Sequence, residues 1–350
     1  MRKVKTGVYL GVFLMVLFAL NVTYISAQTG AGTANFRLRE AMDIDGNGRA
    51  DFSVFRPSEK NWYTYKSGCS SNCTSVYNFT QSNPDNDIIS PGDFDGDGKG
   101  DISVWRRTTG EWHRINSTNG NYVVTAWGTE GDEPVARDYD GDGKTDLAVV
   151  RRTGGQMTWY ISGSSVGYFG AQWGLPTDFV APGDYDGDGK FDITVQRIGS
   201  SPSSPTTFYT LKSSNGGVET ITWGAGDDRV VPGDYDDDGI TDYAVVREWD
   251  KTNANLVWNI RKSSNASQLL ISYGATCTNA VPPNYFVACD ANLTQNDYDG
   301  DGATDISVWR TSASNSSTFF YLTSSSNFQT SAQFQWGVSA DYPIGSYDSH

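Results

Sequence analysis

The chain has 350 residues and is acidic, with 41 Asp and Glu against 26 Lys and Arg and a formal net charge of −15. Aromatic residues make up 13% of it, enough to fill a sizeable core, which argues against a wholly disordered chain. The negative charge argues against a nucleic-acid partner, because phosphate binding needs clustered Lys and Arg. Only His113 and His350 supply imidazoles, which leaves most catalytic triads and histidine zinc sites without their histidines.

Residues 1–27 have the layout of a secretory signal peptide. Three basic residues near the start precede an apolar run, which ends at the small residues Ser26 and Ala27. We expect cleavage after Ala27, which would remove those three charges and change the net charge from −15 to −18. An uncleaved membrane anchor is the alternative, although the run is short for a spanning helix. We expect residues 28–35 to be flexible and residues 36–350 to form the folded domain.

The four cysteines fall into two local pairs, Cys69 with Cys73 and Cys277 with Cys289. In the oxidising surroundings of an exported protein, each pair is expected to close a disulfide that fixes a loop. A zinc site is the alternative, but no histidine or third cysteine lies near either pair in the sequence.

An acidic nine-residue motif, D-x-D-x-[DN]-G-x-x-D, occurs six times. The intervals between successive copies are 50, 45, 46, 50 and 63 residues, which is typical of a repeat architecture. The copies, called loops one to six below, are Asp43–Asp51, Asp93–Asp101, Asp138–Asp146, Asp184–Asp192, Asp234–Asp242 and Asp297–Asp305.

The spacing within the motif predicts a calcium loop. Carboxylates at positions 1, 3, 5 and 9 can converge on one ion, position 7 can add its backbone carbonyl, and glycine at position 6 permits the sharp turn. Hard oxygen ligands in a flexible loop suit Ca²⁺ better than Mg²⁺, and without a cation the carboxylates would repel one another. Solvated acidic turns are the alternative for a single copy, but six copies in register predict about six calcium ions.

The predicted ligands are side chains at positions 1, 3, 5 and 9 and the backbone carbonyl at position 7. In chain order they are Asp43, Asp45, Asn47, Arg49 and Asp51; Asp93, Asp95, Asp97, Lys99 and Asp101; Asp138, Asp140, Asp142, Lys144 and Asp146; Asp184, Asp186, Asp188, Lys190 and Asp192; Asp234, Asp236, Asp238, Ile240 and Asp242; and Asp297, Asp299, Asp301, Ala303 and Asp305.

The residues after the motif argue against an EF-hand, which needs a glutamate at position 12 and flanking helices. All six copies instead have valine there, and the surrounding residues alternate as in a strand. These valines are Val54, Val104, Val149, Val195, Val245 and Val308.

The rest of each repeat predicts a blade of β-sheet. A short extended stretch precedes the loop, a second strand follows it, and then come an aromatic strand and a strand that in most repeats ends in Trp-Gly. Four short strands per period with glycine-rich turns are typical of a propeller blade. The sequence therefore predicts an all-β, single β-propeller with a calcium loop between the first two strands of each blade. Six loops favour six blades, with seven left open, and Asp341–Asp348 is expected to complete the first blade and close the ring.

An arginine recurs five residues after position 9 in every repeat. It could form a basic ring that binds an anion, or it could pair with a neighbouring aspartate or stack on a blade tryptophan. We favour the architectural role, because every blade carries it, and we expect the tryptophans to fill the blade cores. The arginines are Arg56, Arg106, Arg151, Arg197, Arg247 and Arg310.

The acidic loops, the Pro-Gly-Asp-Tyr-Asp lead-in and the Trp-Gly strand end resemble the FG-GAP/VCBS repeat family, whose propeller is similar to the integrin α-subunit head. The resemblance covers about Phe36 to Asp348. It implies a propeller with calcium in the blade loops, in exported proteins that adhere, recognise sugars or serve as domains of larger enzymes. Asn47 in loop one and Asp237 in place of a glycine in loop five depart from the pattern, but both loops are expected to keep their ion.

For function, we hypothesise a secreted or periplasmic calcium-binding propeller that acts as a binding or adhesion module for a glycan or an extracellular protein. A polysaccharide lyase or hydrolase on the same propeller is the alternative. It is the weaker hypothesis, because the clustered aspartates are assigned to calcium and no catalytic constellation stands out around His113. A structural, fibre-forming subunit is a third hypothesis, which the sequence does not separate from the first.

Overall fold

The computed structural model describes residues 42–79, 81–201, 203–226, 228–247, 255–275, 292–312 and 315–345. All of these belong to the second of two compact units, Met1–Thr33 and Ala34–His350. The predicted signal peptide, the flexible segment 28–35 and the predicted Cys277–Cys289 disulfide lie outside the described residues. Within them, no helix has the length and apolar character needed to cross a membrane.

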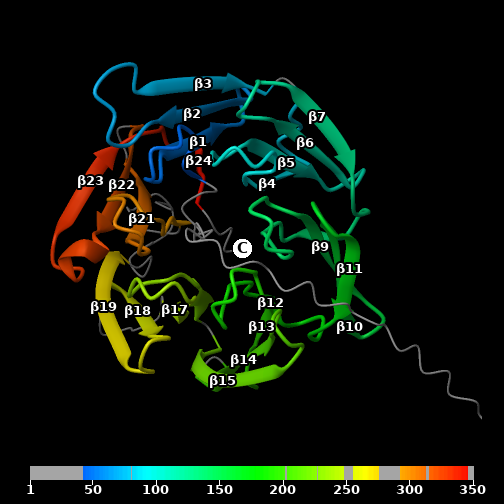
Figure 1. The fold of residues 1–350 in the computed structure, drawn as a ribbon. Coiled ribbons are helices and arrows are strands. Elements are labelled where there is room, and N and C mark those ends of the chain that lie inside the picture. Colours follow the sequence, from blue (N-terminus) through cyan, green and yellow to red (C-terminus); the bar gives the residue numbers. More distant parts are fainter. Residues whose placement is uncertain are drawn as a thin grey trace, which may run out of the picture. The chain divides into compact units, whose positions relative to one another are not determined.

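The described part of the chain forms six antiparallel sheets of four strands each, arranged as the blades of a propeller (Figure 1). From the inner to the outer strand, blade 1 consists of β24 (Tyr342–Pro343), β1 (Phe52–Arg56), β2 (Asn61–Tyr65) and β3 (Thr74–Asn78). Blade 2 consists of β4 (Asp87–Ile89), β5 (Ile102–Arg106), β6 (Glu111–Ile115) and β7 (Tyr122–Ala126). Blade 3 consists of β8 (Glu133–Pro134), β9 (Leu147–Thr153), β10 (Gln156–Gly163) and β11 (Gly167–Gln172).

Blades 4 to 6 follow the same order. Blade 4 consists of β12 (Phe179–Val180), β13 (Ile193–Arg197), β14 (Pro205–Leu211) and β15 (Val218–Ala225). Blade 5 consists of β16 (Arg229–Val230), β17 (Tyr243–Arg247), β18 (Asn255–Arg261) and β19 (Gln268–Ala275). Blade 6 consists of β20 (Asn292–Leu293), β21 (Ile306–Thr311), β22 (Ser317–Leu322) and β23 (Ser331–Gln335). The all-β prediction is confirmed, and the blade count is six.

Burial along a blade explains its sequence pattern. The second strand begins with four consecutive buried residues, as in Leu147–Val150 of β9, because both faces of the sheet are covered near the axis. The third strand alternates, so that Met157, Trp159 and Ile161 of β10 are fully buried. The outer strand alternates between exposed and half-buried residues.

The tryptophans of the third strands are core residues, as the sequence predicts. Trp112 and Trp159 are fully buried, and the indole Nε1 of each donates a hydrogen bond to a backbone oxygen at the end of its own blade's fourth strand, at 2.9 and 3.0 Å. Such a partner offsets the cost of burying the indole N–H group. These rings fill the blades and are not surface platforms for a ligand.

The tryptophans that end the fourth strands join neighbouring blades. Each donates from its indole Nε1 to a backbone carbonyl in the third strand of the next blade, at 2.9 to 3.1 Å. The pairs are Trp127 with Tyr160, Trp173 with Tyr209, Trp223 with Asn259 and Trp336 with Tyr63. The last pair connects blade 6 to blade 1.

The C-terminal strand closes the ring. In β24, Pro343 lies opposite Val54 and Tyr342 opposite Phe55, so the end of the chain supplies the inner strand of blade 1. The next residue, Ile344, is 2% exposed and its amide donates to the Ser53 carbonyl at 3.0 Å. The predicted closure of the first blade by the C-terminal strand is confirmed.

The recurring arginine pairs with an aspartate that stands just before or at the start of the inner strand. Five such pairs have N–O distances of 2.7 to 2.9 Å, with carboxylates that are at most 2% exposed. They are Arg56–Asp341, Arg106–Asp87, Arg151–Asp132, Arg197–Asp178 and Arg247–Asp228. These ion pairs support the architectural role of the arginines.

The aromatic partner of these arginines differs from the expectation. Four of the guanidinium groups lie 4.4 to 4.6 Å from the centre of a tyrosine or phenylalanine ring in the third strand, and not over a tryptophan. The residue before each stacked ring is the fully buried aromatic residue of that strand, Trp62, Trp159, Phe208 or Phe319. The stacked pairs are Arg56 on Tyr63, Arg151 on Tyr160, Arg197 on Tyr209 and Arg310 on Phe320.

One of the two predicted disulfides lies among the described residues and is confirmed. Cys69 and Cys73 are bonded, with their Cα atoms 5.6 Å apart, in the turn between β2 and β3.

Truncating the anchor of the closing strand tests the ring. We expect Ile344→Ala to lower the free energy of unfolding by about 2–5 kcal/mol, because it leaves a cavity where blade 1 closes. The control Val76→Ala, at a residue 56% exposed on β3, should change it by less than about 0.5 kcal/mol. Urea denaturation measures both values, and an equally small effect for Ile344 would contradict closure by this strand.

Candidate metal sites

Loops two to six lie where the sequence predicts, between the first two strands of their blades, whereas loop one leads into β1 and the inner strand of its blade is the C-terminal β24. An isolated β-bridge joins the residue before position 1 to the aspartate at position 9 in loops two to six. In loop three this bridge pairs Arg137 with Asp146, just after β8 and just before β9. Loops two to six are therefore held at both ends by the sheet whose strands they connect.

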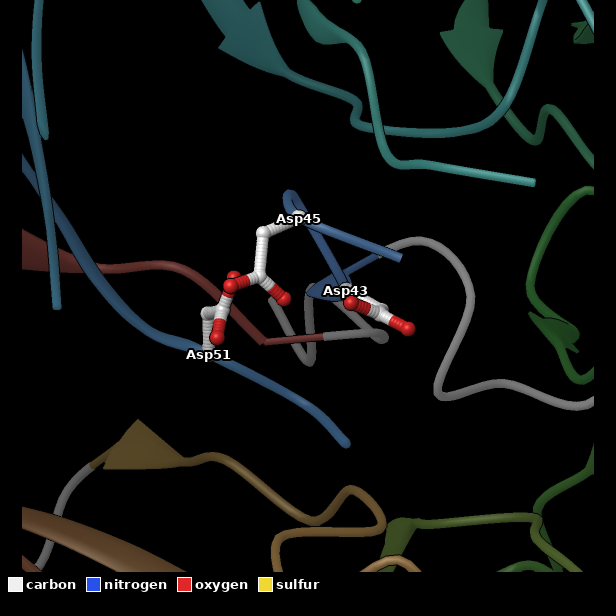
Figure 2. Close-up of side chains that lie close together, drawn as sticks. All are labelled: Asp43, Asp45 and Asp51. Atoms are coloured by element: carbon white, nitrogen blue, oxygen red, sulfur yellow. The ribbon is translucent and has the colours of Figure 1, made fainter. Parts of the chain in front are cut away.

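The carboxylates at positions 1, 3 and 9 converge. In loops one to five, one oxygen from each of the three lies within 4.8 Å of the others, a spacing that could hold a metal ion. Figure 2 shows Asp43, Asp45 and Asp51 of loop one, with the carboxylates of Asp45 and Asp51 pointing toward one another. The structure thus brings together three of the four predicted side-chain ligands of these loops.

The carboxylate at position 9 is the most buried member of the group. In loop three, Asp146 is 1% exposed, and it accepts hydrogen bonds from the backbone amides of Tyr139 at 2.9 Å and Ser164 at 2.7 Å. Burial, together with nearby Asp140, raises the pKa of Asp146 to about 7. Burial likewise raises the pKa of Asp51, Asp192, Asp242 and Asp305 to about 7 and that of Asp101 to about 6.

The carboxylate at position 1 accepts hydrogen bonds from backbone amides of its own loop. Asp138 accepts from the amides of Gly141 at 2.6 Å and Gly143 at 2.9 Å. Both glycines have positive φ, 78° and 92°, a conformation that costs other residues energy. Burial raises the pKa of Asp138 to about 6. The glycine predicted at position 6 is therefore required by the turn.

The carboxylate at position 3 carries the clearest sign of a missing partner. In four loops one of its oxygens is buried and accepts no hydrogen bond. An unpaired buried carboxylate oxygen is costly, and a cation would compensate it. These oxygens are Oδ1 of Asp45, Asp95, Asp186 and Asp236. The donor set fits a hard divalent cation, since all its atoms are oxygens.

The side chain at position 5 is turned toward the protein's own donors. Asp142 accepts from the amide of Lys144 at 2.9 Å and from the hydroxyl of Ser164 at 2.6 Å. Position 5 does not belong to the converging groups of loops one to five. Its role as a metal ligand stays a prediction.

A pair of hydroxyl residues that the sequence analysis missed holds these carboxylates. In blade 3, the hydroxyl of Ser164 donates to Asp142 and that of Ser165 donates to Asp140, at 2.6 and 3.0 Å. Comparable pairs stand in the same turn, between the third and fourth strands, as Ser117–Thr118, Ser213–Ser214, Ser263–Ser264 and Ser324–Ser325. The detectable signal is a hydroxyl pair that starts 16 to 21 residues after position 9 in these repeats.

Backbone hydrogen bonds link the six loops into a closed ring. The amide at position 8 of each loop donates to the carbonyl at position 1 of the preceding loop, at 2.6 to 2.8 Å. The pairs are Ala50 to Asp297, Gly100 to Asp43, Thr145 to Asp93, Phe191 to Asp138, Thr241 to Asp184 and Thr304 to Asp234. The first pair connects loop one with loop six, so no loop is a free end.

Contacts between the loops explain the departure at Asp237. In most loops position 4 is a glycine against which the position 7 side chain of the next loop packs; a Cβ atom on Gly96 would lie 2.6 Å from Lys144. Loop five has Asp237 at position 4, with a φ of 59°, and loop six has the small Ala303 at position 7. The larger residue thus occurs where the neighbouring loop presents a smaller one.

The raised pKa values predict how stability depends on pH. In chelator-treated protein, carboxylates with a folded-state pKa near 7 favour the protonated folded state, so their contribution is full below about pH 4 and lost as the pH rises through about 7. We therefore expect a lower melting temperature at about pH 8 than at about pH 5. A bound cation favours the ionised form, so added divalent cation should stabilise more at the higher pH. A cation effect of equal size at both values would contradict this assignment.

Comparisons with known proteins bear on these repeats. The FG-GAP-like repeat family matches residues 138–195, which run from position 1 of loop three past the end of loop four. A search of the curated proteins gave no match.

Several solved structures match the chain at low identity and low TM-score. A functionally unknown protein from Desulfotomaculum acetoxidans is 10% identical with a TM-score of 0.42, covering 82% of this chain and 80% of that one. A DUF4784 family protein from Bacteroides caccae is 12% identical with a TM-score of 0.45, covering 81% and 70%. An apocarotenoid oxygenase from Synechocystis is 9% identical with a TM-score of 0.41, covering 85% and 88%.

The family match covers one repeat and the next acidic loop, and the structure shows the corresponding blade six times over. The chain is therefore a six-bladed β-propeller that carries an FG-GAP-like repeat at residues 138–195.

Proposed function

We propose that the chain is a calcium-stabilised propeller that serves an exported protein as a binding module. The observation that carries the calcium assignment is the set of buried, unpartnered oxygens at position 3, which lie beside the carboxylates of positions 1 and 9. A divalent cation supplies the positive charge that these oxygens lack. Calcium is favoured over magnesium, because flexible loops with many oxygen donors suit its larger and variable coordination shell.

The residues that would hold calcium are those of the six motifs: the side chains of positions 1, 3, 5 and 9 and the carbonyl of position 7. The two structural motifs around each loop orient them. The turn between the third and fourth strands positions the carboxylates through its serines, and the ring of backbone hydrogen bonds fixes each loop against its neighbours. Calcium bound in one loop would therefore also stabilise the adjacent blades.

Binding rather than catalysis is favoured by the state of the internal imidazole. His113 is 4% exposed, and its Nδ1 atom lies 2.6 Å from the hydroxyl of Tyr122. Burial and the nearby Arg106 lower the pKa of His113, so the ring is neutral at physiological pH. It stands in the third strand, at the position that carries the stacked tyrosine in blades 1, 3 and 4. A blade-packing role accounts for it.

Export is favoured by the Cys69–Cys73 disulfide, because such bonds persist in oxidising compartments. Extracellular fluid also holds more free calcium than the cytoplasm, as modules of moderate affinity require. The ligand proposed for the module is a glycan or an extracellular protein.

Thermal melting with and without calcium tests the metal assignment. A ligand that binds only the folded state stabilises it by about 2.7 kcal/mol per site at a hundredfold excess over Kd. We expect the melting temperature to fall by several degrees or more on treatment with EDTA and to return with calcium. An unchanged melting temperature would contradict calcium as a component of the fold.

A single-loop variant tests which residues bind the ion. Asp192→Asn removes the position 9 charge of loop four, and we expect calorimetry with calcium to detect one site fewer or one markedly weakened site. The matched control is Asp85→Asn, at an exposed aspartate outside the loops. Equal site numbers and affinities in both variants would contradict the ligand set.

A further inference from the structure

A cavity of about 460 Å³ lies among the inner strands of five blades. Its volume is in the range of small-ligand pockets, roughly 300–1,000 Å³. Side chains of β4, β8, β12, β20 and β24 line it, and β4, β12 and β24 are seen near the centre of the ring in Figure 1. None of the described residues of blade 5 contributes to this lining.

One row of equivalent positions on the inner strands differs from all the others. The row contains one residue from each inner strand. In each blade it is the residue paired with the second-strand residue that stands four places after position 9 of the acidic loop. Its members are Ile88, Glu133, Phe179, Arg229, Asn292 and Tyr342. None of the six is buried, and Phe179 and Tyr342 are 42% and 59% exposed.

The rows on either side of this one repeat the same kind of residue from blade to blade, whereas this row does not. The preceding row is aspartate in blades 1 to 5 and pairs with the arginines, and the following row is apolar in all six blades. A position that the blade architecture needs repeats one residue type, as these two rows do. The exposed row between them holds six different residues around one axis. The architecture does not dictate one residue type in this row, and Tyr342 and Asn292 of the row line the cavity, where side chains can recognise a ligand.

The chemistry at the cavity is that of a polar ligand with a flat apolar face. Tyr342 offers an exposed aromatic ring, and Asn292 offers an amide that both donates and accepts. Val180 and Leu293 give apolar wall surface. Sugar rings combine a C–H face with hydroxyl groups, and this set matches both parts.

The charges at the cavity favour an anion. Two lining carboxylates are already neutralised, Asp87 by Arg106 at 2.9 Å and Glu133 by Arg152 at 2.7 Å. Arg107 also lines the cavity, is exposed, and forms no ion pair with the described residues. A guanidinium group without a partner acid, in a protein of net charge −15, is suited to a carboxylate of the ligand.

We propose that this central cavity binds an acidic saccharide, with the sugar carboxylate on Arg107, the sugar ring against Tyr342 and hydroxyl groups on Asn292. The proposal rests on the assignment of the chain as a binding module and names its ligand class and site. The site lies on the inner strands and uses none of the loop carboxylates.

Calorimetric titration with a galacturonic acid disaccharide, in calcium buffer, tests the proposal. We expect binding that is at least about tenfold tighter than that of the neutral galactose disaccharide and that weakens with added salt. Arg107→Gln and Tyr342→Ala should each weaken it at least about tenfold, and Asn292→Ala provides a further variant outside the closing strand. Melting curves check that each variant is folded.

Matched controls separate the site from the rest of the surface. Tyr168→Ala removes a tyrosine that is 65% exposed on β11, and Arg261→Gln removes an arginine of blade 5; neither should change the affinity. The proposal would be overturned if the saccharide did not bind, or if the cavity variants bound it as tightly as the unsubstituted protein. The melting experiment with EDTA and calcium tests the proposed calcium-stabilised module separately.

Discussion

The buried carboxylate at position 9 is the group on which each blade depends. In loop three, Asp146 bridges to the inner strand through its backbone, accepts from the loop amide of Tyr139, and accepts from Ser164 in the turn between the third and fourth strands. One residue thus joins the inner end of the sheet through its backbone and the acidic loop and the outer hairpin through its side chain. Its cost is a charge removed from water beside two other carboxylates, which is why its pKa is raised. A cation at this point would offset the cost of burying these carboxylate charges side by side, while Asp146 keeps the hydrogen bonds that join the parts of the blade.

The ring extends this arrangement from one blade to six. Each loop donates to the preceding one, each of four fourth-strand tryptophans donates to the next blade, and β24 carries the chain back to β1. Because blade 6 contacts blade 1 in the same way as the other blades contact their neighbours, the first and last blades have the same neighbours as the others. No blade has to act as a cap, in contrast to the terminal repeats of open repeat arrays.

Repetition determines how much of this could be predicted from the sequence. The aspartates, the glycine at position 6 and the closing strand recur in register, so they predicted the loops, the blades and the closure. The serine pairs around Asp140 and Asp142 were missed, because the turn lengths vary and shift them between 16 and 21 residues from position 9. The stacking of the arginines on tyrosine was also missed, since it depends on which face of the third strand a residue occupies. That face follows from strand register, which the sequence pattern alone does not reveal.

The same reasoning divides the molecule into two sets of residues. The repeated residues account for the fold and for the acidic loops, and they absorb most of the aspartates that make the chain so acidic. Specificity requires asymmetry, because six identical blades can present only a symmetric surface at their common axis. The row from Ile88 to Tyr342 breaks the symmetry there, and none of its six side chains belongs to the buried class of residues. A repeat protein of this kind can therefore vary the residues at its axis while its acidic loops and interblade contacts stay the same.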